Sequence, residues 1–167
     1  MTLIQDRPVR STTRPVFANL ENAPATGRQP SSREGIHEMQ FEMMNQAFRT
    51  YGGFVTCDEV VRRLRWINDQ PLSLLARRIV GRAVLNVSWR NQILSPLFQF
   101  DLADTSVRPA CARVLSELGD IFDDWELALW FATPNSWLYS VAPVALLDVN
   151  EREVWQAARA DRFIACG

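Results

Sequence analysis

Arginine side chains between residues 56 and 100 are the first candidates for chemistry in this sequence. This stretch carries seven arginines and three acidic residues, a net charge of +4. A guanidinium group can donate two parallel hydrogen bonds to a phosphate or to the major-groove edge of guanine. The candidate DNA-binding residues are Arg62, Arg63, Arg77, Arg78, Arg82 and Arg90. Their chemistry favours contact with double-stranded DNA, and the alternative is a solvated charged face on a structural module.

A second candidate surface lies in the acidic C-terminal part. Residues 101–167 carry five arginines and eleven acidic residues, a net charge of −6, and four of the six tryptophans lie between residues 125 and 155. Tryptophan is enriched at interaction hot spots, although such rings also fill the core of small helical domains. We expect most of these rings in the core and Trp137, in the Pro134-Asn135 loop, partly exposed. The opposite charges of the two stretches indicate different partners.

Residue types that carry catalysis or bind metals are sparse. The chain has one histidine, His37, and three widely spaced cysteines without a Cys-x-x-Cys motif, so no zinc site of the usual spacing is expected. There is no glycine-rich phosphate loop. The paired acids Asp123-Asp124 and Glu151/Glu153 stand at predicted helix starts, where capping explains them without chemistry. We therefore expect no enzymatic activity, no cofactor and no metal.

Length and composition fit a globular protein with a core of its own. The chain has 167 residues, enough for one domain or two small ones, and 47% of them are apolar. Its start has no apolar signal region, and no apolar run is long enough to span a bilayer. These features predict a soluble, cytosolic protein with reduced thiols.

The N-terminal part is predicted to begin with a disordered arm over residues 1–33. Four of the nine prolines fall there among many polar residues, and few apolar residues recur with any period. Its arginines could touch DNA, although a plain flexible tail is the favoured interpretation. Residues 34–51 then predict a helix in which Ile36, Met39, Met43, Ala47 and Tyr51 recur at helical spacing, with Met44 and Phe48 widening the apolar face, ended by Gly52-Gly53. This stripe is either core or a contact between two copies of the chain.

Residues 34–100 are predicted to form a winged helix-turn-helix. Thr56 and Glu59 have the spacing of a capping box for a short helix. Asp69 and Pro71 suit the start of a second helix that runs to about Gly81 and buries Leu72, Leu75, Ile79 and Val80. The period then changes to two over residues 85–89, and a return strand follows a turn at Arg90-Asn91. Two short helices followed by a hairpin are typical of this fold.

Residues 101–167 are predicted to form a small helical domain. Pro109 begins a helix that ends at Gly119, and Asp123-Asp124 caps the next, over residues 125–132. A short helix is expected at 143–147, and Asn150 with Glu153 has the spacing of a looser capping box for the last helix. The whole chain is thus predicted to be mainly α, with a winged helix-turn-helix followed by this helical domain.

The C-terminal segment resembles the toxin-binding domain of the Xre/MbcA/ParS-type antitoxins. The matching residues, spread over about residues 120–160, are Trp130, Pro134-Asn135, Leu138, Pro143, Leu146-Leu147 and Val154. Residues 96–100 also look like the join between domains in members that carry an excisionase-like winged helix. The chain departs from the pattern at Tyr139-Ser140, where members often have glycine, and in its short tail.

The resemblance implies a division of labour between the two parts. The N-terminal module would bind operator DNA, and the C-terminal module would bind a RES-type toxin, an NAD-consuming enzyme, as part of a homodimer. The candidate partner-binding residues are Trp130, Pro134, Asn135, Trp137, Leu138 and Phe163. The alternative is a protein-interaction module, or an orphan regulator of the same fold without a toxin.

Overall fold

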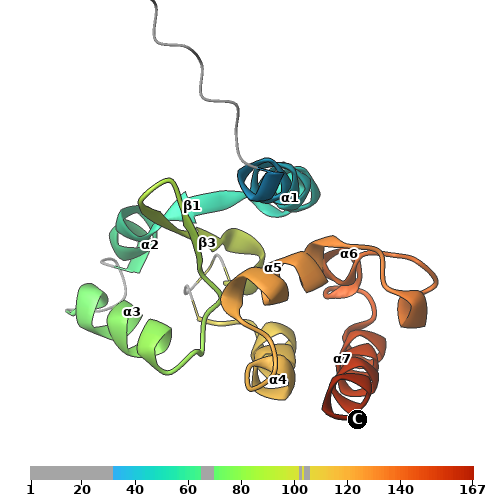
Figure 1. The fold of residues 1–167 in the computed structure, drawn as a ribbon. Coiled ribbons are helices and arrows are strands. Elements are labelled where there is room, and N and C mark those ends of the chain that lie inside the picture. The colour runs from blue at the N-terminus through green and yellow to red at the C-terminus, as the bar shows by residue number, and fades with distance from the viewer. Residues whose placement is uncertain (1–31, 65–69, 102, 104–105) are drawn as a thin grey trace, which may run out of the picture.

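The computed structural model describes residues 32–64, 70–101, 103 and 106–167 (Figure 1). Within these ranges the protein is mainly helical and contains a three-stranded antiparallel sheet, which confirms the predicted predominance of helix. The predicted arm lies outside the described residues except for its last two positions. Arg65 and the predicted helix cap Asp69 also lie outside them.

The first half of the chain alternates helices with short strands. Its elements are α1 (Ser32–Phe48), the 3-10 helix η1 (Arg49–Tyr51), β1 (Phe54–Thr56), α2 (Cys57–Leu64) and α3 (Pro71–Val80). The chain leaves the first helical segment through Gly52 and Gly53, both at positive φ, and the Gly53 amide donates to the Phe48 carbonyl at 2.9 Å. A Cβ atom on Gly52 would lie 2.9 Å from the Leu97 Cβ atom. The predicted glycine stop is therefore also a point of close packing.

The sheet has the strand order β1-β3-β2, and β2 (Val87–Trp89) and β3 (Gln92–Pro96) form a hairpin. Arg90 and Asn91 both have positive φ, as a two-residue hairpin turn requires, so the predicted turn is confirmed. β1 pairs antiparallel with β3 and places Val55 opposite Ser95. The sequence analysis missed β1, because three residues are too few to show a two-residue period.

The second half is a set of helices joined by short turns. Its elements are η2 (Leu97–Gln99), α4 (Pro109–Leu118), α5 (Asp124–Ala132), η3 (Ser136–Leu138), α6 (Pro143–Leu146) and α7 (Glu151–Cys166). Figure 1 shows α2 and α3 at the opposite end of the molecule from α6 and α7. Surfaces at these two ends can therefore meet different partners.

The predicted helix caps have different outcomes in the structure. Asp123 and Glu126 form a complete capping box at the start of α5. Thr56 accepts from the Glu59 amide at 3.4 Å, but the Glu59 carboxylate pairs with arginines of α2 instead of reaching back. The predicted capping box at Asn150 was wrong, because the Asn150 side chain makes no cap hydrogen bond.

The main hydrophobic core contains residues from both sides of residue 100, the predicted boundary between the two domains. Met44 and Phe48 of α1 and Val87 of β2 are buried in one cluster with Leu118, Phe131 and other residues of α4–α7. A smaller cluster joins α2 and α3 to residues 97–100, which we call the connector. Its buried members are Val60, Val61, Leu75, Val84, Leu97 and Phe100. The helical C-terminal part and α1 are thus packed as one unit in this structure.

On two helices only part of the predicted apolar face is buried. On α1, Met44 and Phe48 are buried, whereas Met39 is 69% exposed and Ile36 and Met43 also face outward. Apolar residues lie around much of this helix, so their spacing alone does not select the buried face. On α3, Leu75 is buried as predicted, but Leu72 and Val80 are exposed.

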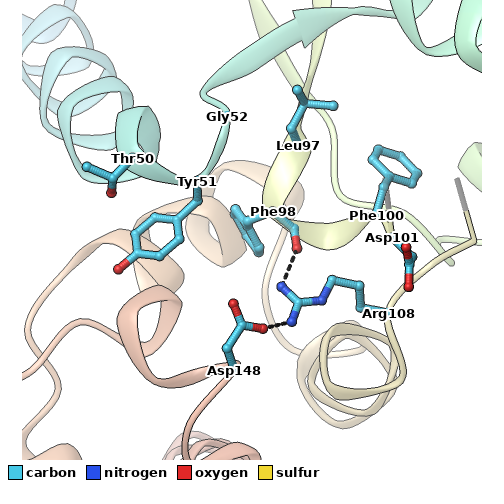
Figure 2. Close-up of a pocket in the computed structure, with 9 residues that line it drawn as sticks. All are labelled: Thr50, Tyr51, Gly52, Leu97, Phe98, Phe100, Asp101, Arg108 and Asp148. Carbon is cyan, nitrogen blue, oxygen red and sulfur yellow. Dashed lines mark hydrogen bonds and ion pairs between the residues drawn. The ribbon is translucent and has the colours of Figure 1, made fainter. Parts of the chain in front are cut away.

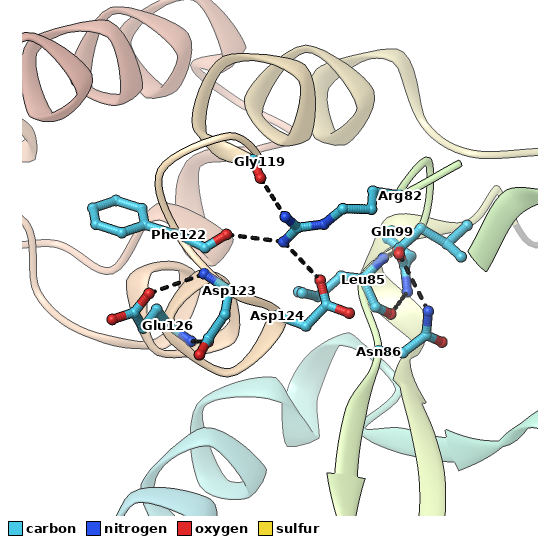
Figure 3. A network of polar contacts seen from close by, with 10 residues as sticks. Arg82, Leu85, Asn86, Gln99, Gly119, Phe122, Asp123, Asp124 and Glu126 are labelled. Atoms are coloured by element: carbon cyan, nitrogen blue, oxygen red, sulfur yellow. Dashed lines mark hydrogen bonds and ion pairs between the residues drawn. The ribbon is translucent and has the colours of Figure 1, made fainter. Parts of the chain in front are cut away.

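Gln99 is fully buried and acts as a polar clamp between the two halves (Figure 3). Its Oε1 atom accepts from the Leu85 amide at 2.7 Å, and its Nε2 atom donates to the Leu85 carbonyl at 2.8 Å and the Pro96 carbonyl at 3.1 Å. The side chain therefore satisfies backbone groups that β2, which begins at Val87, does not reach.

We expect Gln99→Leu to lower the free energy of unfolding by about 2–4 kcal/mol, because the buried Leu85 amide and carbonyl would lose their partner. Urea denaturation followed by circular dichroism measures the change. Gln92→Leu, at an exposed position of β3, is the control and should change stability by less than about 0.5 kcal/mol. Equal effects of the two substitutions would show that the clamp contributes nothing.

Candidate nucleic-acid and partner interfaces

α3 presents an exposed face without acidic residues. Gln70 precedes the helix, and Pro71 occupies its first turn, where the missing amide proton costs no hydrogen bond. The exposed residues of α3 are Leu72, Ser73, Ala76, Arg77 and Val80, and Arg78 is half-buried. Arg77 and Arg78 stand in the last turn, so positive charge gathers at the C-terminal end of the helix.

The two candidate arginines of α2 share one acidic partner. Arg62 and Arg63 pair with the Glu59 carboxylate at 2.5 Å and 3.1 Å. The Arg62 side chain is 67% exposed, and ion pairs at such positions stabilise a fold only slightly. Both guanidinium groups therefore lie at the surface, with a carboxylate between them that a phosphate would have to replace.

The candidate arginine at the hairpin tip is held against α1. Arg90 pairs with Glu38 at 2.7 Å, and its guanidinium carbon lies 5.5 Å from the centre of the Trp89 ring. Trp89 in turn stacks on Phe41 with ring centres 4.2 Å apart. The hairpin tip is thus anchored to the first helix, and Arg90 stays largely exposed at that contact.

Arg82 lies along the surface against the turn between α4 and α5 (Figure 3), and its side chain is 46% exposed. It follows α3 with φ at +49°, and its guanidinium donates to the Gly119 and Phe122 carbonyls and pairs with Asp124 at 3.1 Å. These acceptors belong to the turn between α4 and α5 and to the first residue of α5. The sequence analysis placed Arg82 with the DNA-contacting arginines, whereas here it joins the end of α3 to the C-terminal helices.

The carboxylate of Asp161 on α7 organises the Trp-Pro-Asn segment. Its Oδ2 atom accepts from Trp130 Nε1 and from Asn135 Nδ2, each at 2.7 Å, and its Oδ1 atom accepts from Trp137 Nε1 at 3.0 Å. Asn135 also caps η3 by accepting from the Trp137 amide at 2.8 Å. Sequence reasoning missed Asp161, because it lies 31 residues from Trp130 and no local motif marks it.

These contacts separate the predicted partner-binding residues into two groups. Leu138 is fully buried and Trp130 nearly so, which corrects their assignment to a partner-contacting surface. Asn135 is half-buried and bonded to Asp161, and Pro134 is exposed. Trp137 is 54% exposed, as predicted, so one face of a fixed indole ring remains open to solvent.

Further large side chains are exposed on the segment after Trp137 and in the last turns of α7. Tyr139 and Ser140 both adopt the left-handed conformation that glycine tolerates best, and Tyr139 projects into solvent. Phe163 and Ile164, on the α7 turn that also carries Asp161, are 78% and 63% exposed. We call Trp137, Tyr139, Phe163 and Ile164 the aromatic end of the molecule.

A hollow lies where the connector meets the start of α4 (Figure 2). Its volume is about 470 Å³, and Tyr51, Phe98, Phe100, Arg108 and Asp148 contribute to its wall. The Arg108 guanidinium donates to the Phe98 carbonyl at 3.3 Å and pairs with Asp148. Arg108 thereby links the connector to the turn before α7, while Asp101, the third charged residue of the wall, accepts from the Ala103 amide at 2.8 Å.

Two observations within the described residues bear on metal binding and nucleophilic chemistry. Among them, no group of three His, Cys, Asp or Glu side chains is placed to hold a metal ion. Burial raises the pKa of the Cys111 thiol to about 12, so this cysteine is a poor nucleophile at neutral pH. Within the same ranges, no helix has the length and apolar character needed to cross a bilayer.

We expect Asp161→Ala to lower the free energy of unfolding by about 1–3 kcal/mol, because three donors would lose their acceptor. The indole N–H resonances of Trp130 and Trp137 should shift in a ¹H–¹⁵N spectrum. Gln156→Ala, at an exposed position of the same helix, is the control. Unmoved indole resonances in the Asp161 variant would contradict the network.

Comparison with known proteins identifies no relative. No protein-family model, curated protein or solved structure matches the chain.

Proposed function

We propose that this protein is an antitoxin-like DNA-binding regulator, in which α2, α3 and the hairpin contact operator DNA and the aromatic end contacts a RES-type toxin. The observation that carries the proposal is the element order α1-β1-α2-α3-β2-β3 together with the strand order β1-β3-β2. This is the arrangement expected of a winged helix, in which the second helix of the motif enters the major groove.

The exposed face of α3 supports its role as the recognition helix. Ser73 can hydrogen-bond to base edges, Ala76 can contact a thymine methyl group, and Arg77 can donate to guanine. α3 contains no acidic residue that would repel phosphate. Arg62 and Arg63 on α2 would contact the backbone after exchanging Glu59 for a phosphate. Arg82 would act indirectly by fixing the end of α3.

The second candidate function is a protein-interaction module without DNA binding. The pairing of surface arginines with acids favours it, because Arg62 and Arg63 share Glu59 and Arg90 pairs with Glu38. Such pairs lower the positive potential that attracts DNA. Leu72 and Val80, exposed on α3, would then form part of a protein-binding surface.

A salt series with DNA from upstream of the gene separates the two functions. We expect nanomolar binding that weakens steeply with salt. The double substitution Arg77→Ala and Arg78→Ala should weaken binding by about 1–3 kcal/mol for each arginine that contacts a base and should flatten the salt slope. Fluorescence anisotropy with labelled duplexes measures both quantities.

Arg113→Ala is the matched control for this experiment. Arg113 is exposed on α4 and pairs with Glu151, away from the proposed DNA-binding face, so its loss should leave the affinity unchanged. Binding no stronger than that to random DNA would overturn the DNA-binding proposal and favour the interaction module.

The aromatic end supports the proposed toxin contact. Asp161 and Asn135 hold Trp137 in place before any partner arrives, which reduces the entropy lost on binding. Exposed Trp and Tyr side chains are frequent anchors of interfaces. The net charge of −6 over residues 101–167 would favour a basic surface on the partner.

We expect Trp137→Ala to abolish protection against a RES-type toxin that is co-expressed in bacteria, with cellular NAD content as the readout. The reason is the loss of the exposed indole face while the rest of the fold stays in place. Trp155→Ala is the control, because Trp155 is half-buried on α7 beneath Arg159. NAD levels that stay as high with Trp137→Ala as with the unchanged chain would exclude this contact.

A further inference from the structure

The outward side of α1 is an apolar strip with an acidic rim. Its apolar residues are Ile36, Met39 and Met43, and Glu38 and Glu42 stand beside them. Together with Gly35 and Gln46, most of these residues line a shallow hollow along the helix. We call this the outer face of α1.

The outer face cannot turn into the core. The opposite side of the helix carries Met44 and Phe48, both fully buried. Phe41 stacks on Trp89, and Gln40 accepts from Trp125 Nε1 at 2.9 Å. These contacts fix the helix in its rotation, so covering the outer face requires another segment or another molecule.

A second copy of the chain is a poor occupant on grounds of charge. α1 has Glu34, Glu38 and Glu42 along this side, of which Glu38 also pairs with Arg90 at the hairpin tip. Packing two such helices against each other would bring these carboxylates together. Like charges facing each other across an interface are destabilising. Apolar side chains flanked by carboxylates instead suit a segment that combines apolar residues with arginine, and methionine adapts to varied apolar surfaces.

The sequence immediately before α1 contains such a segment. Residues 14–20 read Arg-Pro-Val-Phe-Ala-Asn-Leu, with one arginine, three large apolar residues and no acid. Eleven residues separate Leu20 from Ser32, the first residue of α1. An extended chain of that length reaches about 36 Å, whereas the helix from Ser32 to Gln46 rises only about 21 Å. The segment can therefore return to any part of the outer face.

We propose that residues 14–20 bind the outer face of α1 in the same chain. Val16, Phe17 and Leu20 would cover Met39 and Met43, and Arg14 would lie among the carboxylates of the rim. Apolar contact would drive the docking and the charges would set its direction. The N-terminal segment would then act as a cover for α1, and this proposal does not depend on DNA or toxin binding.

Oxidation of methionine by hydrogen peroxide tests the proposal in the full chain. The chain has four methionines, and Met44 is fully buried, so its slow oxidation reports that the fold is intact. The variant carries Phe17→Asp and Leu20→Asp. We expect Met39 to oxidise about tenfold faster in the variant than in the unchanged chain, which corresponds to about 1.4 kcal/mol of docking. Peptide mass spectrometry follows each methionine separately.

The matched control carries Leu3→Asp and Ile4→Asp, which change apolar residues of the same N-terminal stretch outside residues 14–20. Met39 in this control should oxidise as slowly as in the unchanged chain. Equal rates for Met39 in the unchanged chain and in the Phe17/Leu20 variant would overturn the proposal. Protection that rises with protein concentration and survives in that variant would also overturn it and would identify a second copy as the occupant.

Discussion

The connector at residues 97–100 is the constraint on which the rest of the structure depends, because it divides its side chains between two cores. Leu97 and Phe100 enter the smaller cluster with α2 and α3, whereas Phe98 enters the main cluster with α1 and the C-terminal helices. Gln99, between them, clamps both backbone groups of Leu85. If the connector shifted by one residue along the chain, the side-chain amide of Gln99 would enter an apolar core. Polar groups that are buried there without hydrogen-bond partners are costly. The connector therefore fixes how the helix pair and hairpin sit against the helical remainder.

Two charged side chains near the proposed interfaces each hold a neighbouring segment in place through several polar contacts. Arg82 fastens the end of α3 to the turn before α5, and Asp161 fastens the Trp-Pro-Asn segment to α7. Each collects several acceptors or donors from a single stretch of chain, which restricts that stretch more than one hydrogen bond would. In both places a rigid internal contact lies beside an exposed functional candidate, Arg77 in one case and Trp137 in the other. Rigidity of this kind reduces the entropy lost when a partner binds.

The distribution of charge relates the two ends of the molecule. Positive charge gathers at the end of α3, whereas on α2 Arg62 and Arg63 are balanced by Asp58 and Glu59, and acids predominate after residue 100. Figure 1 shows α7, which carries Glu151, Glu153 and Asp161, at the opposite end from α2 and α3. Asp120, between α4 and α5, instead lines a hollow together with Arg78, so some of these acids lie close to the end of α3. Glu59 and Glu38 lower the positive potential locally, because they pair with Arg62 and Arg90. Electrostatic attraction of DNA would then depend on α3 more than on the hairpin, because Arg90 at the hairpin tip is paired with Glu38 of α1.

Features that depend on neighbours within a few residues could be predicted from the order of amino acids. That order predicted the glycine stop after α1, the hairpin turn at Arg90-Asn91, the proline starts of α3 and α4 and the cap at Asp123, because turns and caps are formed by local hydrogen bonds and local backbone preferences. The tertiary structure alone decided which face of α1 is buried, where the Arg82 side chain points and which residue anchors Trp137. Those outcomes depend on pairs such as Arg82 and Asp124, 42 residues apart, and no periodicity within one segment encodes a contact between distant segments.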